Sequence, residues 1–520
     1  MESAYLDAAD LDIDAVIDAF APATEVGREA LAERLSNPIT DIDEIGARQQ
    51  EIRDIKRACK GKEIAIREVL ATLKATEADV VSVRDASTDE RLKEYYTQIM
   101  WDQKSAAARL NHMGWLNELI VFFRTIFIPG LSILLPVFIF IAPLILYMVV
   151  LKEPITFSKY IDMIQGAIKK AVPSVLGAQR FKGTGGLAET SEQFVHVAVA
   201  VAMLGVSIWN QVSAALHMRT IVGDMRRRAT AVQKFTEGVR RLGSLMEVTV
   251  DCGEAWSLGP LGVFGDAWND PDRVSAILEE AGRLDMLVSV ASRKMTCMAT
   301  LSSTDLGLTD LYHPGVAKDK RILNSLTMTE KTHILLTGPN RGGKSTLLKS
   351  LGYAVLMSQT VGVVFARKAT LPVFQSIITA LAPTDVVGKM SLFEAEIEFA
   401  KTVLGRLGKG KTFLMMDEIF HGTNAHDGVE AAQVFLDRVY GSKDTYSIVS
   451  THYMDLPSKY GPHATANLCM GASVDPTDPD RLIYTYRLGP GVNNHSSVRE
   501  ILRERGLLRS LPPKNNGPSE

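Results

Sequence analysis

The sequence contains few of the residues that build zinc-binding or disulfide-bonded proteins. Its four cysteines, Cys59, Cys252, Cys297 and Cys469, are widely separated and form no CxxC pair and no Cys/His cluster. This spacing argues against a disulfide framework and a structural zinc site, and it suits a reducing compartment. The chain also lacks an excess of one charge, because the formal net charge of its 520 residues is −3. Composition therefore does not indicate a globally basic nucleic-acid-binding protein, although a local basic patch stays open.

The first residues show no sign of a leader. The stretch MESAYLDAADLDIDAV is acidic and lacks the basic region and apolar core of a signal or transit peptide. We therefore expect no cleavable segment in this stretch. At 520 residues, the chain is long enough for two to four domains.

Two long stretches lack charged side chains. Residues Thr125–Leu151 and Phe194–Met218 contain no Asp, Glu, Lys or Arg. A helix needs about 20 apolar residues to cross the hydrocarbon core of a membrane. We therefore predict two transmembrane helices; the alternative is a pair of buried core helices, which are usually shorter or have a polar face. The second run contains His196, Asn210, Gln211 and His217, which would face a partner helix or the interface.

The sequence around these runs suggests how they are arranged. Pro129, Pro136 and Pro143 recur every seven residues in the first run, which predicts a bent helix or a hinge. The segment between the runs has apolar positions at helical spacing with lysines between them, typical of a helix on a membrane surface. Two spans place the regions before and after them on the same side of the membrane. The basic residues Arg226–Arg228, just after the second span, favour the cytoplasmic side for both regions.

A phosphate-binding loop follows a short apolar stretch near residue 335. HILLTGPNRGGKSTLLKSLGYAV reads as strand, glycine-rich turn and helix, and it fits G-x-x-x-x-G-K-[ST]. The backbone N–H groups of such a turn cradle phosphates, Lys344 would reach the β- and γ-phosphates, and Ser345 would bind Mg²⁺. The predicted nucleotide-binding residues are Gly338, Pro339, Asn340, Arg341, Gly342, Gly343, Lys344, Ser345 and Thr346.

Two acids end a second apolar stretch. In KTFLMMDEIFHGTNAHDG, Asp417 is placed to bind Mg²⁺, and Glu418 to polarise the attacking water. The alternative is an acidic surface pair after a core strand. A third apolar stretch, YSIVSTH, ends at His452, which either contacts the water or γ-phosphate or is solvated. Alternating strands and helices with ligands at the strand ends predict an α/β ATPase.

These motifs resemble the MutS family of mismatch-repair ATPases. TGPNRGGKST is similar to the family's TGPNMGGKST, with Arg341 in place of Met. The second motif matches DE-I-x-x-GT-x-x-x-DG through Asp417, Glu418, Gly422, Thr423, Asp427 and Gly428. STHYMDL resembles the family's ATHY segment, which implies that His452 is a catalytic switch residue. The resemblance extends from LYHPGV at residue 311 to YTYRLGPGVNNHSSVREILRERGLL, and implies ATP and Mg²⁺ as cofactors.

The resemblance also implies a dimer. VVGKMSLFEAEIEFAKTVL is similar to the signature GRSTFMVEM and keeps Ser391, Phe393 and Glu396, but not its Gly-Arg. In the family this serine meets the nucleotide of the opposite subunit, which implies a head-to-tail homodimer. LAERLSNPITDIDEIGARQQEIRDI and ILEEAGRLDMLVSVASRKM resemble the family's helical core, and their apolar spacing independently supports helices.

We therefore expect a C-terminal α/β P-loop ATPase domain preceded by an all-α, lever-like core that two transmembrane helices interrupt. The expected divisions are a helical part at 1–115, a membrane region at 116–218, a second helical part at 219–300, the ATPase domain at 301–508 and a disordered tail at 509–520.

The sequence departs from the family pattern in further respects. The apolar runs occupy the position of the DNA-contacting clamp, and there is no room ahead of the core for mismatch-reading and connector domains. Phe235-Thr236-Glu237 is an isolated F-x-E triplet, but it lies in a polar helical stretch, so we do not expect it to be a mismatch-reading wedge. Arg321 stands where the family has an aromatic residue near adenine, which puts adenine stacking in doubt.

Three functions are consistent with these features. The first is a membrane-anchored, multi-pass ATPase, with its N- and C-terminal parts in the cytoplasm, whose nucleotide cycle moves the levers and membrane helices. The second is a membrane-tethered mismatch-repair or recombination factor, in which RTIVGDMRRRATAVQK contacts DNA phosphates, although lipid head groups suit these residues equally. The third is a scaffold gated by nucleotide that hydrolyses ATP slowly.

Overall fold

The computed structural model describes residues 4–7, 10–86, 88–134, 186–381 and 391–507, and three isolated positions between 134 and 186. Side chains in the segment that begins at 186 are described from residue 202 onward. The chain forms two compact units. Unit 1 comprises Met1–Ala71, Arg241–Val250 and Glu279–Glu520, and unit 2 comprises Thr72–Arg240 and Asp251–Leu278. The expected domain divisions at 115, 218 and 300 remain predictions.

Unit 1 contains a seven-stranded sheet in the order β1-β8-β9-β10-β5-β11-β12. All neighbouring pairs are parallel except β11 and β12, which form an antiparallel pair. The strands are β1 (Tyr5–Asp7), β5 (His333–Thr337), β8 (Ser376–Ala380), β9 (Thr412–Met416), β10 (Thr445–Ser450), β11 (Ala466–Asp475) and β12 (Asp478–Pro490). Residues of β5, β9 and β10 are buried on both faces, which explains why these strands are continuous apolar stretches rather than alternating ones.

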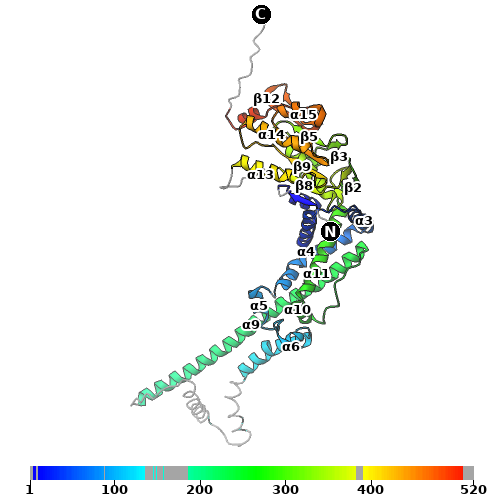
Figure 1. Ribbon diagram of the computed structural model, residues 1–520. Coiled ribbons are helices and arrows are strands. Elements are labelled where there is room, and N and C mark those ends of the chain that lie inside the picture. Colours follow the sequence, from blue (N-terminus) through cyan, green and yellow to red (C-terminus); the bar gives the residue numbers. More distant parts are fainter. Residues whose placement is uncertain are drawn as a thin grey trace. The chain divides into compact units, whose positions relative to one another are not determined.

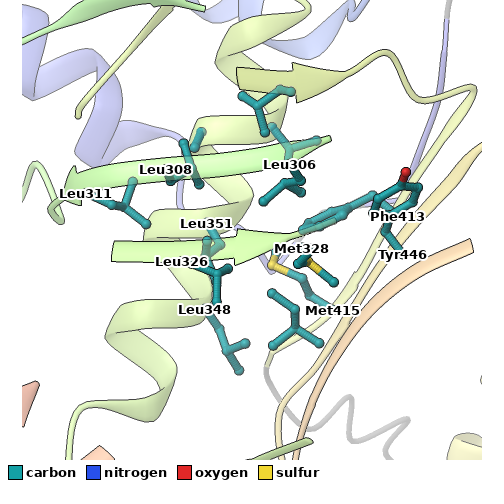
Figure 2. Close-up of a cluster of buried hydrophobic side chains, with 14 of the residues drawn as sticks. Leu306, Leu308, Leu311, Leu326, Met328, Leu348, Leu351, Phe413, Met415 and Tyr446 are labelled. Atoms are coloured by element: carbon teal, nitrogen blue, oxygen red, sulfur yellow. The ribbon is translucent and has the colours of Figure 1, made fainter. Parts of the chain in front are cut away.

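A second, five-stranded sheet lies in the same unit, in the order β4-β3-β7-β2-β6. Its strands are β2 (Cys297–Ser302), β3 (Leu306–Leu311), β4 (Asn324–Met328), β6 (Val363–Val364) and β7 (Lys368–Pro372). Figure 2 shows its leucines facing α12 (Lys344–Ser358) and the large sheet; the cluster includes Leu306, Leu308, Leu326, Leu348, Leu351, Phe413, Met415 and Tyr446. Because both sheets cover α12, this helix has almost no polar face.

Helices cover the other face of the large sheet. Figure 1 shows α13 (Leu392–Leu404) and α14 (Ala425–Tyr440) beside the strands, with α15 (Asp455–Ala464) nearby. Phe435, Leu436 and Val439 of α14 pack on Leu335 and Leu414. Neighbouring residues of one strand therefore enter opposite layers, as Leu335 and Leu336 do, because side chains alternate along a strand. The α/β fold predicted for the C-terminal part is confirmed.

The N-terminal region is helical, as predicted, with one exception. Its helices in unit 1 and unit 2 are α1 (Asp14–Phe20), α2 (Glu25–Ser36), α3 (Ile42–Ala58), α4 (Glu63–Asp85), α5 (Glu90–Tyr96), η1 (Ala106–Leu110) and α6 (Gly114–Phe122). The exception is β1, which pairs with β8 at the edge of the large sheet. The carboxylate of Asp10 accepts hydrogen bonds from the Thr379 hydroxyl and the Leu381 N–H, so the segment before α1 is attached to the large sheet.

Three further helices precede the strands of the second sheet, and the first of them, with 61 residues, begins inside the predicted membrane region. They are α9 (Gly186–Met246), α10 (Pro260–Asn269) and α11 (Pro271–Ser292), and the short helices η4 (Lys318–Lys320) and α16 (Val498–Glu504) occur further on. Within unit 1, the buried carboxylate of Asp285 on α11 accepts from the N–H of Thr24 at 2.8 Å and from its hydroxyl at 2.7 Å. Thr24 in turn caps α2, so one carboxylate joins the start of α2 to α11.

One of the two predicted membrane runs is partly described. Within the described residues, one helix, Gly114–Leu134, is long and apolar enough to span a membrane, and 22 % of its most apolar window is buried. It includes a π-helical turn, η2 (Phe123–Phe127). Pro129 follows, and it has no N–H for the Thr125 carbonyl, which accounts for the irregular turn. Most of Thr125–Leu151, with Pro136 and Pro143, lies outside the described residues; Phe194–Met218 falls within α9.

Candidate functional site

The phosphate-binding loop joins β5 to α12. Gly338 and Gly343 have φ angles of 141° and 92°, values that favour glycine because side chains with a Cβ are strained there. Gly343 is the residue before the first turn of α12, so the loop and the helix N-terminus present their N–H groups to the same space. Arg341 also has a positive φ, 66°, at the turn of the loop. The backbone therefore has the form that the glycine pattern predicts.

Lys344 is buried, with 4 % of its surface exposed. Its Nζ donates hydrogen bonds to the carbonyl oxygens of Gly338 at 2.9 Å and Pro339 at 3.3 Å. Burial lowers the pKa of Lys344, whereas the charges of Glu418 and Asp417 oppose that shift. The ammonium group is thus folded back on its own loop, within the field of both acids.

Asp417 follows β9 and joins three elements. The hydroxyls of Ser345 on α12 and Ser450 on β10 each donate to a different carboxylate oxygen of Asp417. Ser450 Oγ also accepts from the N–H of Glu418 at 2.9 Å. Because these residues follow or end neighbouring parallel strands, the topology gathers them at one edge of the sheet. Asp417 and Ser345 are therefore adjacent, as predicted for residues that share a metal ion.

Glu418 is paired with His452. The Nε2 atom of His452 lies 2.6 Å from Oε1 of Glu418, so this ring nitrogen donates to the carboxylate. The hydrogen bond lowers the pKa of Glu418 below its usual value, partial burial opposes the shift, and the charge of Lys344 adds to it. Glu418 has a φ of 55°, a strained conformation of the kind found at functional sites. Glu418 is therefore ionised at neutral pH and fixed in direction.

The donor set at Asp417 fits Mg²⁺. A hydroxyl from Ser345 and a carboxylate from Asp417 are the hard oxygen ligands that this ion prefers, with water and phosphate oxygens completing the shell. Among the described residues, no group of three or more His, Cys, Asp or Glu side chains could hold a metal by itself.

A cavity of about 610 Å³ extends from this loop. Its lining includes the predicted residues Pro339, Asn340, Arg341, Gly343, Lys344, Ser345, Thr346 and Glu418. Gly338 and Gly342 contribute to the loop backbone. Asp417 is not among the lining residues of this cavity but lines, with Glu418, a second cavity of about 360 Å³ that Asp10 and Glu396 also line.

Ser391 is exposed at the start of α13 and is not among the lining residues of either cavity. Its hydroxyl accepts from the Glu394 N–H at 3.3 Å, and the Glu394 carboxylate accepts from the Ser391 N–H at 2.9 Å, which forms a capping box. Glu396, one turn further, accepts from the N–H groups of His421 at 3.2 Å and Gly422 at 3.1 Å. Helix α13 is thus attached to the loop that follows Glu418.

Ser450 and the contact between Arg321 and Tyr312 were not predicted from the sequence. Ser450 binds Asp417 and the Glu418 backbone, and its position at the end of an apolar strand was an available signal. The stacking of Arg321 on Tyr312, with the guanidinium carbon 4.6 Å from the ring centroid, has no sequence signature. It depends on the path of the loop between β3 and β4.

Comparisons with known proteins agree with this geometry. The family model described as MutS domain V matches residues 334–507. The DNA mismatch repair protein MutS of Shouchella clausii is 31 % identical over 191 residues, which is 35 % of this chain and 22 % of that protein. The protein of the same name from Petrotoga mobilis is 29 % identical over 210 residues, 40 % of this chain and 25 % of that protein. The chain thus spans about a quarter of the length of the curated relatives it matches.

Proposed function

We propose that this chain, a member of the MutS family through its residues 334–507, is a membrane-anchored ATPase that binds and hydrolyses MgATP as a head-to-tail homodimer. One observation carries the proposal. The phosphate loop with Lys344 and Ser345, the acids Asp417 and Glu418, and His452 come from three separate parts of the sequence and meet at the carboxyl edge of one sheet.

Each residue has a role that follows from its position. The loop N–H groups and the start of α12 bind the phosphates, and Lys344 exchanges its carbonyl partners for the stronger charged acceptors of a triphosphate. Ser345 and Asp417 hold Mg²⁺, which neutralises charge on the phosphates. Glu418, ionised and held by His452, orients the attacking water and takes up its proton.

A dimer would complete the site. Ser391 is exposed at the N-terminus of α13 and outside the lining of the cavity of its own chain. A helix N-terminus attracts phosphate, and in the resemblance noted above this serine contacts the partner's nucleotide. The Glu396 carboxylate accepts hydrogen bonds from the backbone N–H groups of His421 and Gly422. A movement of α13 would therefore also move the loop that carries Glu418.

Exposed apolar side chains in unit 2 support the membrane anchor. On Gly114–Leu134, the exposed large side chains are Trp115, Leu119, Phe122, Phe123, Ile126, Phe127, Ile128, Leu131 and Leu134. On α9, Val206 and Trp209 are 59 % and 71 % exposed. Exposing so many adjacent apolar side chains to water is unfavourable, whereas contact with the hydrocarbon core of a membrane is favourable for them. With two spans, the nucleotide site and both flanking regions face the cytoplasm, where ATP is available.

A DNA mismatch-repair or recombination role is the second candidate, and the names of the relatives favour it. The similarity, however, covers 35–40 % of this chain. Arg226, Arg227 and Arg228 are paired with Glu118, Asp79 and Asp224 inside unit 2, and these carboxylates weaken their attraction for DNA phosphates. A slow, nucleotide-gated scaffold is the third candidate, and it requires that Glu418 be dispensable.

The ATPase rate of full-length protein in lipid nanodiscs tests these alternatives. We expect turnover that depends on lipid composition and is insensitive to duplex DNA. Mismatch-dependent stimulation would instead support the repair role, and stimulation by any DNA that disappears with salt would indicate only backbone attraction. Equal turnover by wild type and Glu418→Gln would contradict the assigned catalytic base and favour the scaffold.

A further inference from the structure

The loop that begins at Glu418 has a strained backbone. Glu418 and Phe420 have φ angles of 55° and 53°, in the left-handed region that residues with a Cβ rarely adopt. A backbone of this kind keeps its conformation only when the surrounding structure holds it. The contacts that hold this loop therefore determine the direction of the Glu418 carboxylate.

One side of the loop is held by β10 and the turn after it. The Ser450 hydroxyl accepts from the Glu418 N–H at 2.9 Å, and the Tyr453 hydroxyl donates to the Phe420 carbonyl at 2.8 Å. The same turn carries His452, the partner of the Glu418 carboxylate. This side therefore supports both members of the carboxylate–imidazole pair.

The other side of the loop is held by Glu396 of α13. One carboxylate oxygen accepts from the His421 N–H at 3.2 Å, and the other accepts from the Gly422 N–H at 3.1 Å. A Cβ at Gly422 would lie 2.8 Å from the Phe393 nitrogen and 3.0 Å from Glu396 Oε2, so glycine is needed for this close approach. Hydrogen bonds to an ionised carboxylate are stronger than neutral ones, and two of them fix the loop against α13.

The ring of His421 joins the same carboxylate to the backbone of Glu418. Its Nδ1 atom lies 3.0 Å from Glu396 Oε1 and 2.8 Å from the Glu418 carbonyl oxygen. Both oxygens are acceptors, so Nδ1 carries the proton and donates to them. The contacts from α13 to the backbone of Glu418 are therefore continuous.

These contacts lie apart from the surface that would bind the triphosphate. Glu418 lines the cavity at the phosphate loop, whereas Glu396 and His421 are not among its lining residues. The hydrogen bonds of Lys344 within the phosphate loop also involve neither residue. Loss of Glu396 or His421 should therefore change turnover rather than ATP binding.

We propose that Glu396 and His421 are positioning residues, which hold the loop of Glu418 from α13 so that its carboxylate faces the attacking water. This inference rests on the proposed function, since it assumes that Glu418 is the base in ATP hydrolysis. Because α13 begins at Ser391, the direction of Glu418 depends on the helix whose first residue would meet the partner's nucleotide.

Steady-state ATPase kinetics and equilibrium ATP binding, both with the full chain in lipid nanodiscs, test the proposal. Glu396→Ala removes both contacts to the loop backbone. We expect kcat to fall by about 100-fold, as for a displacement of about 1 Å, with the Kd for ATP unchanged. Glu396→Gln has one acceptor oxygen in place of two, and its kcat should lie between those of Glu396→Ala and wild type. Glu398→Ala, at an exposed glutamate of the same helix, is the matched control and should keep wild-type kcat.

Two variants of the loop test the same contacts from the other side. Gly422→Ala keeps the Glu396 carboxylate but places a Cβ against the first turn of α13, so it should lower kcat and leave ATP binding unchanged. His421→Ala keeps the backbone N–H groups and removes the ring, which should lower kcat by about tenfold. Combined with Glu396→Ala, it should have a smaller effect, because the ring has then already lost its carboxylate partner.

The remaining outcomes count against the proposal in different ways. Wild-type kcat in Glu396→Ala would overturn the inference and leave the proposed function standing. A loss of ATP affinity as large as the loss of kcat would also overturn it, because α13 would then maintain the whole site rather than the direction of Glu418. Effects of Glu396→Ala and His421→Ala that simply multiply would refute their joint action. Absence of ATP hydrolysis by wild type would instead contradict the proposed function itself.

Discussion

His452 Nε2 lies 2.6 Å from Glu418 Oε1, across 34 residues of sequence. Glu418 and His452, which follow the neighbouring strands β9 and β10, therefore form a carboxylate–imidazole pair. It fixes the direction of the carboxylate, and lowers its pKa, so that Glu418 is ionised before a nucleotide arrives. The pair supports the proposal that Glu418 is the catalytic base rather than Asp417, whose oxygens both accept hydrogen bonds from serine hydroxyls.

Replacing Glu418 should separate binding from turnover. Glu418→Gln keeps the shape of the side chain and loses its basicity, so we expect ATP binding to persist and kcat to fall by at least about 100-fold. Steady-state ATPase rates and equilibrium ATP binding measure the two effects. Glu398→Gln, an exposed glutamate paired with Lys401 on α13, is the control and should leave both unchanged.

Loss of Lys344 should act on binding first. Lys344→Ala removes the buried ammonium next to the loop carbonyls, and we expect tight ATP binding to disappear. The exposed Lys443→Ala serves as control. ATP binding by Lys344→Ala at wild-type affinity would show that the triphosphate does not lie in this loop.

Ser391 can be tested by mixing variants. In a head-to-tail dimer, each site combines the phosphate loop of one chain with Ser391 of the other. Ser391→Ala and Lys344→Ala should each be inactive alone, whereas an equal mixture should recover about a quarter of wild-type turnover through randomly formed mixed dimers. Turnover that stays absent in the mixture, with exchange of subunits verified, would exclude the contact in trans.

Ser391→Ala also removes a helix cap, which costs about 1 kcal/mol. Glu394→Ala weakens the same capping box and keeps the hydroxyl. Glu394→Ala should therefore lower the stability of α13 but remain active as a single variant, without a second variant to complement it. This comparison separates the capping role of Ser391 from its proposed contact with the partner's nucleotide.

The pair formed by Arg341 and Glu504 links the phosphate loop to α16 at 2.5 Å, with side chains 44 % and 53 % exposed. Exposed pairs add little to stability, so Glu504→Gln should fold normally. It should bind ATP several-fold more tightly, because the guanidinium no longer shares its charge with a carboxylate. When it is combined with Glu504→Gln, Arg341→Met should abolish this gain in ATP affinity. Equal ATP affinity of wild type and Glu504→Gln would show that Arg341 does not sense the nucleotide.

His333 should make unfolding depend on pH. It is buried on β5 beside Ser447, and burial lowers its pKa to about 4 from an ordinary 6.5. The unfolded state therefore binds a proton between these values while the folded state does not. The free energy of unfolding should fall by roughly 3 kcal/mol as pH drops through this window. Pulse proteolysis in urea would measure it, and His333→Gln should lose this part of the pH dependence.

Local patterns determined a large part of this protein. The glycine spacing predicts a strand, a phosphate loop and a helix, which the structure has as β5, a turn with positive φ angles at Gly338 and Gly343, and α12, and apolar stretches ending in Asp417 and at His452 predict β9 and β10. These predictions succeed because a strand–turn–helix is specified by neighbouring residues, and because parallel strands bring their carboxyl ends to one edge.

Tertiary structure alone decided the rest. Three contacts have no local signature in the sequence. They are the hydrogen bond between Asp10 and Thr379, across 369 residues, the stacking of Arg321 on Tyr312 and the ion pair of Arg227 with Asp79. Side chains far apart in sequence meet only after the chain has taken its path, and hydrophobic periodicity reports which face is buried but not what covers it. The sequence therefore predicts the phosphate site, and the fold determines what surrounds it.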